Sequence, residues 1–193
     1  MEKGKSMDLA FVLGVAALLV LGGFLTYNTL IARKNQVDNA YGAVEAYLKK
    51  RHDLIPNLVE AVKRYMAHER ELLERLVELR ERAKEAEGKG PEEAFRLEGE
   101  LSRLLAQVRL RAEAYPDLKA SQNFLQLQAA LTEVEDSLAA ARRFYNQAVT
   151  DYNNAIEQIP GRFLAPLMGL GRKPVFTIPE EERETPDLGK LFA

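Results

Sequence analysis

The residue types that carry most acid–base and metal chemistry are scarce in this chain. It has two histidines, His52 and His68, and no cysteine. A carboxylate-bridged di-metal centre in a helical bundle needs two Glu-x-x-His pairs, and neither histidine has a glutamate three residues before it. His68-Glu69 begins a zinc-protease motif, but position 72, where the second histidine is required, is leucine. The sequence therefore predicts no metal site and no cofactor.

Other catalytic patterns are equally missing from the sequence. It contains no glycine-rich phosphate loop, and no serine lies in a nucleophile-elbow context. Glu133, Glu135 and Asp136 flank an apolar helical stripe, and we interpret them as a solvated face. The 27 Lys and Arg nearly balance the 29 Asp and Glu, for a net charge of -2, which gives no basic footprint for nucleic acid. These observations predict a protein that is not an enzyme.

The chain opens on a candidate membrane anchor. Leu9 to Leu25 are 17 consecutive residues without a charged or polar side chain, and the next basic pair is Arg33-Lys34. About 20 residues of helix cross a bilayer core, so residues 9–32 are long enough to span it. A cleaved signal peptide is the main alternative, but its apolar region is about 7–15 residues long and ends in a small-x-small site. No small-x-small pair follows the run, so we expect an uncleaved anchor in the cell membrane.

Lysine and arginine counts indicate which side of the membrane carries the rest of the chain. Lys3 and Lys5 precede the span, whereas Arg33, Lys34 and the basic run 49–51 come after it. Positive charges close to a span favour the cytoplasmic side. By a small margin, the count favours a cytoplasmic C-terminal part.

Apolar residues at helical spacing continue to about residue 159 and predict four helices. The first leaves the anchor and ends near Arg51, because Asp53 is a good N-cap and Pro56 fits the first turn of a new helix. Turn formers at 88–91 separate the second helix from the third. The fourth has an apolar residue or tyrosine at every stripe position from 124 to 159.

Long helices joined by short turns are typical of an antiparallel up-down-up-down bundle. We therefore expect an all-α fold in which an N-terminal transmembrane helix leads into an antiparallel four-helix bundle. The predicted parts are a flank (1–8), the anchor (9–32), the helical bundle (33–160) and a C-terminal region (161–193). Residues 162–173 are apolar in the middle and basic at both ends, so they either lie on the membrane interface or fold back onto the bundle. An extended acidic tail, 174–193, completes the chain.

Two groups of residues are candidate interaction sites. The first is the predicted turn between the first two helices, which carries Lys49, Lys50, Arg51, His52 and Asp53. One interpretation is a docking turn that presents positive charge to a partner. The other, which we favour, is plain capping, in which Asp53 caps the next helix and the basic cluster stabilises the end of the previous one.

The second group is a candidate assembly surface at the end of the fourth helix and just after it: Asn146, Asn153, Asn154, Phe163, Leu164 and Leu167. The amides of Asn146 and Asn153 fall beside the apolar stripe, where they could bond a neighbouring helix or subunit. A role in fold specificity is favoured over ligand binding. Because the fourth helix is longer than the first, we expect its last stripe residues to be covered by another copy of the chain.

Three blocks of residues resemble the LemA family. They are KKRHDLIPNLV at 49–59, YPDLKASQNFLQLQ at 115–128, and ARRFYN at 141–146 with the DYN at 151–153. With the anchor before them, they cover about residues 8–180 in the family's order. Ile159 stands where the family usually has phenylalanine, and the stretch 167–175 is poorer in aromatic residues than usual.

The resemblance implies a bacterial single-pass membrane protein with a soluble bundle of long antiparallel helices. It implies no activity, because the family has no agreed biochemical function. Members are linked in general terms to membrane stress, to neighbouring membrane metalloproteases and to magnetosome membranes. We therefore expect a membrane-anchored interaction or scaffold protein that assembles as a homo-oligomer.

A second functional hypothesis is a regulatory or sensory subunit. Such a protein would bind a ligand in the bundle, where Ala141, Ala148 and Ala155 could leave room, or would modulate a membrane partner such as a metalloprotease. Close helix packing explains these alanines equally well.

Overall fold

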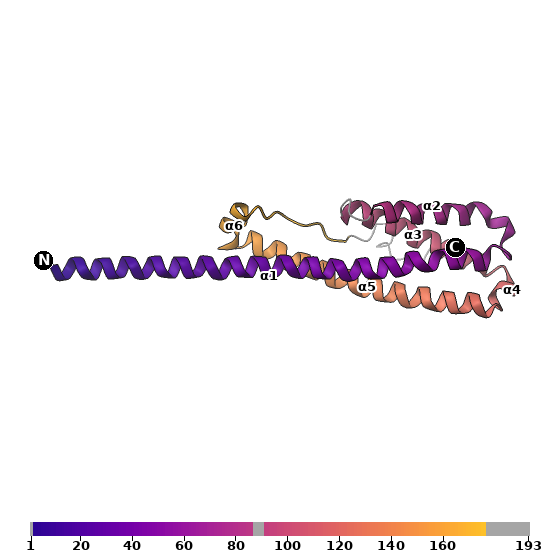
Figure 1. Cartoon of the computed structure of the whole chain (residues 1–193), viewed down its shortest axis with the longest axis horizontal. Helices are drawn as coiled ribbons and strands as arrows, with labels where there is room; N and C mark the ends of the chain where they lie inside the picture. Colours follow the sequence, from indigo (N-terminus) through magenta and orange to yellow (C-terminus); the bar gives the residue numbers. More distant parts are fainter. Residues whose placement is uncertain (1, 87–90, 177–193) are drawn as a thin grey trace, which may run out of the picture. The chain divides into compact units, whose positions relative to one another are not determined.

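The computed structural model describes residues 2–86 and 91–176, and every regular element in these ranges is helical. In chain order the elements are α1 (Glu2–Val62), the 3-10 helix η1 (Ala67–Glu69), α2 (Arg70–Glu85), α3 (Pro91–Ala112), α4 (Pro116–Lys119), α5 (Gln122–Glu157), α6 (Gly161–Leu164) and the 3-10 helix η2 (Pro166–Met168) (Figure 1). The all-α prediction is confirmed. The predicted turn at 88–90 and the part of the acidic tail after 176 lie outside the described residues.

Helix α1 runs without a break through the position where the sequence predicted a turn. Asp53 and Pro56 lie inside it, so the predicted boundary is wrong, and the helix ends only at Val62. A proline inside a helix removes one backbone hydrogen bond, here the bond to the carbonyl of His52 four residues earlier. The Arg80 Nε of α2 donates to that carbonyl instead, at 2.7 Å. Because a tertiary contact replaces the missing bond, Pro56 does not end the helix.

The N-terminal part of α1 corresponds to the predicted anchor. The helix is long and apolar enough to cross a membrane, and none of its most apolar stretch is buried. Large apolar side chains such as Phe11 and Leu18 are 73% and 70% exposed. Lipid is the surrounding that suits such a surface, and the finding is consistent with the predicted membrane anchor.

The described chain forms two compact units. Among the described residues, unit 1 comprises 2–42 and 144–175, and unit 2 comprises 43–86, 91–143 and 176. Helices α1 and α5 each contribute a segment to both units. Each unit therefore has its own core.

In unit 2 a single hydrophobic core receives side chains from all of α1 to α5. Its most deeply buried members, each at most 1% exposed, are Ile55, Val62, Met66, Leu76, Leu101, Val108 and Leu118. The residues from α2 and α3 fall at the three- and four-residue spacings that the sequence predicted. These stripes are confirmed, while the antiparallel four-helix arrangement of the whole bundle stays a prediction.

In unit 1 the core lies between the segments of α1 and α5. Leu30 and Val37 of α1 and Val149 and Tyr152 of α5 are at most 2% exposed. The predicted stripe of the fourth helix is therefore buried in this unit as far as Tyr152. After α5 and α6 the chain passes through η2 and then turns at Gly169, whose φ of 65° lies in the left-handed region that glycine adopts most readily.

Residues 170–174 have no regular secondary structure and pack back along α5. The Tyr152 hydroxyl donates to the carbonyl of Gly171 at 3.0 Å. The amide of Asn153 bonds both backbone groups of Lys173, each at 3.0 Å. The Tyr145 hydroxyl donates to the carbonyl of Pro174 at 3.1 Å. Of the two alternatives predicted for residues 162–173, folding back onto the bundle therefore describes 171–173.

The predicted extended tail does not begin at Pro174. Phe176 is 7% exposed in unit 2, with its ring centroid 4.1 Å from that of Phe95 and 4.2 Å from the guanidinium carbon of Arg142. An aromatic ring with an apolar neighbour and a stacked cation has left water, so this part of the C-terminal region belongs to the folded structure.

Candidate functional site

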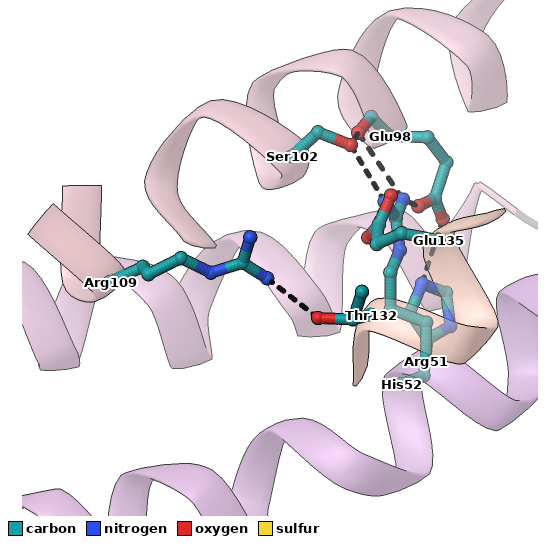
Figure 2. A network of polar contacts seen from close by, with 7 residues as sticks. All are labelled: Arg51, His52, Glu98, Ser102, Arg109, Thr132 and Glu135. Carbon is teal, nitrogen blue, oxygen red and sulfur yellow. Dashed lines mark hydrogen bonds and ion pairs between the residues drawn. The ribbon is translucent and has the colours of Figure 1, made fainter. Parts of the chain in front are cut away.

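Unit 2 encloses a cluster of polar and charged side chains within its core (Figure 2). Its members are Arg51 and His52 of α1, Glu98 and Ser102 of α3, and Glu135 of α5. Arg51, His52 and Glu98 are at most 1% exposed. Because charged side chains are almost never fully buried unless they are paired, this is the part of the described chain where chemistry could concentrate. We refer to the five residues as the buried polar network.

Helix periodicity turns these residues inward. In α1, Leu48 and Ile55 are core residues, and both Arg51 and His52 lie between them on the same helix face. In α3, Glu98 lies on the face of the buried leucines three and six residues after it. Arg51 and His52 therefore point inward because α1 is one continuous helix.

Glu98 is the centre of the buried polar network. Its Oε1 lies 2.7 Å from His52 Nε2, and its Oε2 pairs with Arg51 Nη2. Its backbone carbonyl accepts from Arg51 Nη2 at 3.2 Å and from Ser102 Oγ at 3.1 Å. Arg51 Nη1 donates to Ser102 Oγ at 2.7 Å and to Glu135 Oε1 at 2.8 Å. One guanidinium therefore joins α1 to both α3 and α5.

The network favours its own charged form. Burial would by itself raise the pKa of Glu98, but the hydrogen bond from His52 and the charge of Arg51 together lower that pKa below its ordinary value. Burial likewise opposes the charge of Arg51, and the carboxylates of Glu98 and Glu135 nevertheless hold its pKa above its ordinary value. An ionised Glu98 only accepts hydrogen bonds, so Nε2 of His52 is the donor in their contact.

The buried polar network has little access for a substrate. The side chains of Arg51, His52 and Glu98 are at most 2% exposed, whereas that of Glu135 is 31% exposed. A nearby pair, Arg109 Nη2 donating to Thr132 Oγ1 at 3.3 Å, is exposed (Figure 2). Within the described residues no group of three or more His, Asp or Glu could hold a metal ion. The arrangement is suited to fixing three helices against one another.

The predicted docking turn is not a turn. Lys49, Lys50 and Asp53 are exposed in the middle of α1, while Arg51 and His52 point into the core. Asp53 is also not an N-cap, because the helix neither ends nor begins there. Both interpretations of this segment assumed the wrong helix boundary, and the five residues do not share one surface.

The asparagines predicted on an assembly surface have different environments. Asn153 is 6% exposed, and its amide both donates to and accepts from the backbone of Lys173. Asn146 is half-buried, and Asn154 is exposed. Fold specificity, the role favoured for Asn153, fits this contact, which lies within the chain.

The apolar part of the predicted assembly surface remains exposed. Phe163 and Leu167 are 68% and 84% exposed, and Leu164 is half-buried. Tyr152, one of the late stripe residues of the fourth helix, needs no covering copy, because it is 1% exposed and donates to the carbonyl of Gly171 in the returning C-terminal segment. Ile159, the last stripe residue, is 76% exposed.

Sequence reasoning missed most of the buried polar network. Glu98 and Ser102 were not singled out, and Glu135 was assigned to a solvated face, although its Oε1 pairs with Arg51. The sequence carried no clear signal for Glu98, because Leu97 and Leu101 occupy the apolar stripe of α3 and Glu98 lies beside it.

The similarity of this chain to known proteins covers the network and most of the helical region. A family model for the LemA family matches residues 40–189. Protein LemA of Metamycoplasma hominis is 26% identical over 166 residues, which are 85% of this chain and 74% of that protein. Magnetosome proteins MamQ 1 and MamQ 2 of Paramagnetospirillum magneticum are each 34% identical over 76 residues, which are 39% of this chain and 26% of each relative.

The family match extends over far more than half of the chain and includes all five residues of the buried polar network. The all-helical structure of the described residues agrees with the resemblance that the three sequence blocks carry. The chain therefore belongs to the LemA family.

Proposed function

We propose that this protein is a non-catalytic, membrane-anchored scaffold that presents a helical domain at the cell membrane and self-assembles there. The observation that carries the proposal is the continuity of α1. The N-terminal stretch of this helix is apolar and exposed, while Leu30, Val44 and Ile55 further along the same helix are core residues. The predicted anchor and the folded part of the chain are therefore joined without a linker.

The buried polar network supports a structural role for the chain's charged residues. Arg51, His52 and Glu98 are occupied with one another inside the core, and membership of the LemA family suggests a non-catalytic helical protein. Charges engaged in packing helices are not available to a substrate.

The lipid bilayer is the first partner in this proposal, contacted through residues 9–32. The lysine and arginine count favours placing the helical domain on the cytoplasmic side. Copies held in one membrane meet at a raised effective concentration, which favours lateral homo-oligomers even when each contact is weak.

Membrane anchoring is tested by fractionation and intact mass. The full chain should stay with membranes after an alkaline carbonate wash, and its mass should include residues 1–26. A mature protein that begins after residue 26 would show a cleaved signal peptide and would overturn the anchor.

Self-assembly is tested by crosslinking in native membranes. Because the chain has no cysteine, Asn154→Cys introduces a single thiol at an exposed position of α5, and Lys84→Cys, at an exposed position of α2, is the control. A short bifunctional thiol reagent should produce dimers from Asn154→Cys and few from Lys84→Cys. Equal yields would favour a monomeric anchor protein. Crosslinks solely to a different membrane protein would favour the regulatory role, with a membrane protease among the candidate partners.

A further inference from the structure

A second apolar surface of unit 1 lies outside the predicted anchor. Ile159, Phe163 and Leu167, in the segment that contains α6 and η2, are 76%, 68% and 84% exposed. Ala165, in the middle of the same segment, is 2% exposed. The segment therefore turns one side towards the protein and three large apolar side chains outward.

This exposure is built into the fold. Ala165 N donates to the carbonyl of Gly161 at 2.8 Å, and Leu170 N donates to the carbonyl of Ala165 at 2.9 Å. Residues 171–173 are held by Tyr152 and Asn153 of α5. Because these hydrogen bonds fix both the segment and residues 171–173, the three apolar side chains cannot turn inward without breaking them.

The segment lies beside the end of the anchor. One open groove of unit 1 is lined by Leu25, Thr26 and Leu30 of α1 together with Ile159, Pro160 and Gly161. A Cβ added to Gly161 would lie 1.9 Å from the carbonyl oxygen of Ala155 and 3.5 Å from Leu30 Cδ2. The absence of a side chain at Gly161 therefore lets the segment pack at the level of Leu25–Leu30.

That level corresponds to the membrane interface. The uncharged run Leu9–Leu25 spans about 26 Å at a helical rise of about 1.5 Å per residue. The hydrocarbon core of a bilayer is about 30 Å thick, so it ends within about a turn of Leu25. Residues 26–30, which include Tyr27 and two threonines, then lie at the boundary between the hydrocarbon core and the headgroup layer. The segment packed beside them lies at the same depth.

We propose that residues 159–168 form a second lipid contact, in which Ile159, Phe163 and Leu167 insert into the interface of the bilayer that holds the anchor. The exposed Arg162 lies next to Phe163 and suits anionic head groups. The inference rests on the membrane anchoring in the proposed function. We choose lipid as the partner of this surface because the surface adjoins the end of the anchor and lies at the depth of the membrane interface.

The test uses environment-sensitive fluorophores on single cysteines in the full chain. Phe163→Cys and Leu167→Cys are labelled and reconstituted into vesicles of phosphatidylcholine and phosphatidylglycerol. Leu18→Cys reports on the anchor, and Leu110→Cys, 72% exposed on α3 of unit 2, is the matched apolar control. Each label is quenched separately by spin-labelled lipid and by iodide present on both sides of the vesicles, and circular dichroism checks that each variant is folded.

The proposal expects labels at 163 and 167 to be quenched by lipid carrying a shallow spin label and to be several-fold less accessible to iodide than the label at 110. Water-accessible labels at 163 and 167, with lipid quenching at 18, would overturn the second contact and leave the anchor intact. Absence of lipid quenching at 18 would overturn the anchor itself. Labels at 163 and 167 shielded from both quenchers would mean that protein, such as a second copy, covers the surface instead of lipid.

Discussion

Unit 1 and unit 2 both bury polar side chains, but they bury different kinds. Unit 2 encloses charged residues from three helices, with Arg51 paired to Glu98 and Glu135. Unit 1 uses neutral residues of one helix, Tyr152 and Asn153, which bond the backbone of a segment without secondary structure. Unit 2 therefore joins helices through charged side chains, whereas unit 1 holds a segment without secondary structure through neutral side chains.

The difference arises from which groups still need partners. Inside a helix the backbone N–H and C=O groups already bond one another, so only side chains can link one helix to the next. Residues 171–174 have backbone groups with no helical partner, and neutral donors and acceptors satisfy these without the cost of burying a charge. A charged pair thus fixes one helix against another. The hydrogen bonds from Tyr152 and Asn153 to the backbone of Gly171 and Lys173, which we call the neutral clamp, fix a loop.

Removing the centre of the buried polar network should have the largest effect. Glu98→Ala leaves the buried guanidinium of Arg51 without its nearest counter-charge, and breaking a buried ion pair in this way costs about 3–5 kcal/mol. Urea unfolding of the full chain in detergent, monitored by circular dichroism, measures the loss. Glu74→Ala, which removes the exposed partner of Arg70, is the control and should leave stability unchanged. Similar losses in both variants would contradict a special role for the network.

Acid should weaken the same network. The pKa of Glu98 is lower in the folded protein than in the unfolded chain, so its contribution to stability is complete above the ordinary glutamate pKa of about 4.3 and is lost as pH falls through the lower folded value. The free energy of unfolding should therefore drop more steeply with acid in the wild type than in Glu98→Gln. Unfolding curves at a series of pH values test this, and parallel pH profiles would refute it.

Breaking the neutral clamp of unit 1 should cost less. Asn153→Ala removes two hydrogen bonds to the backbone of Lys173, with an expected loss of about 1–3 kcal/mol. Hydrogen exchange should also accelerate at the amide of Lys173, because its acceptor is gone. Asn154→Ala, the exposed neighbour, is the matched control. Unchanged exchange around 171–174 in Asn153→Ala would show that the clamp does not hold the segment.

The smallest effect concerns the proline inside α1. Arg80 bonds the carbonyl of His52 that Pro56 leaves without its helical partner, and Pro56→Ala restores the missing N–H. Arg80→Ala should therefore cost about 1 kcal/mol more in the wild type than in the Pro56→Ala background. A double-mutant cycle of unfolding free energies measures the coupling. Strictly additive losses would mean that Arg80 does not compensate for the proline.

Local periodicity was enough to predict much of the fold. Most buried residues of α2, α3 and α5 lie at positions that apolar spacing indicated, although Ile159 at the end of the last stripe is exposed, and α3 begins at Pro91 as the turn signals required. These features depend on side chains a turn apart on one helix, which the sequence displays directly. The error at residues 51–56 has a different origin, because the bond that compensates for Pro56 comes from Arg80, which is distant along the chain.

The candidate site was beyond local reasoning for the same reason. Arg51 and His52 were taken for surface residues at a helix end, since a basic cluster before a cap residue is typical of one. Their partners lie on α3 and α5, 46 and 84 residues away in sequence. Glu98 carried no clear sign either, because the apolar stripe of α3 runs through its neighbour Leu97 and through Leu101.

The sequence by itself determined the helical class, the long apolar run at the N-terminus, the spacing of most core residues and the absence of thiol chemistry. Each is a property of composition or of neighbours within one or two helical turns. Only the tertiary structure decided that α1 continues to Val62, that Glu98 pairs with Arg51, and that Asn153 clamps Lys173. These features depend on polar groups from distant segments meeting where water is excluded, and whether a buried group finds its partner is decided by packing.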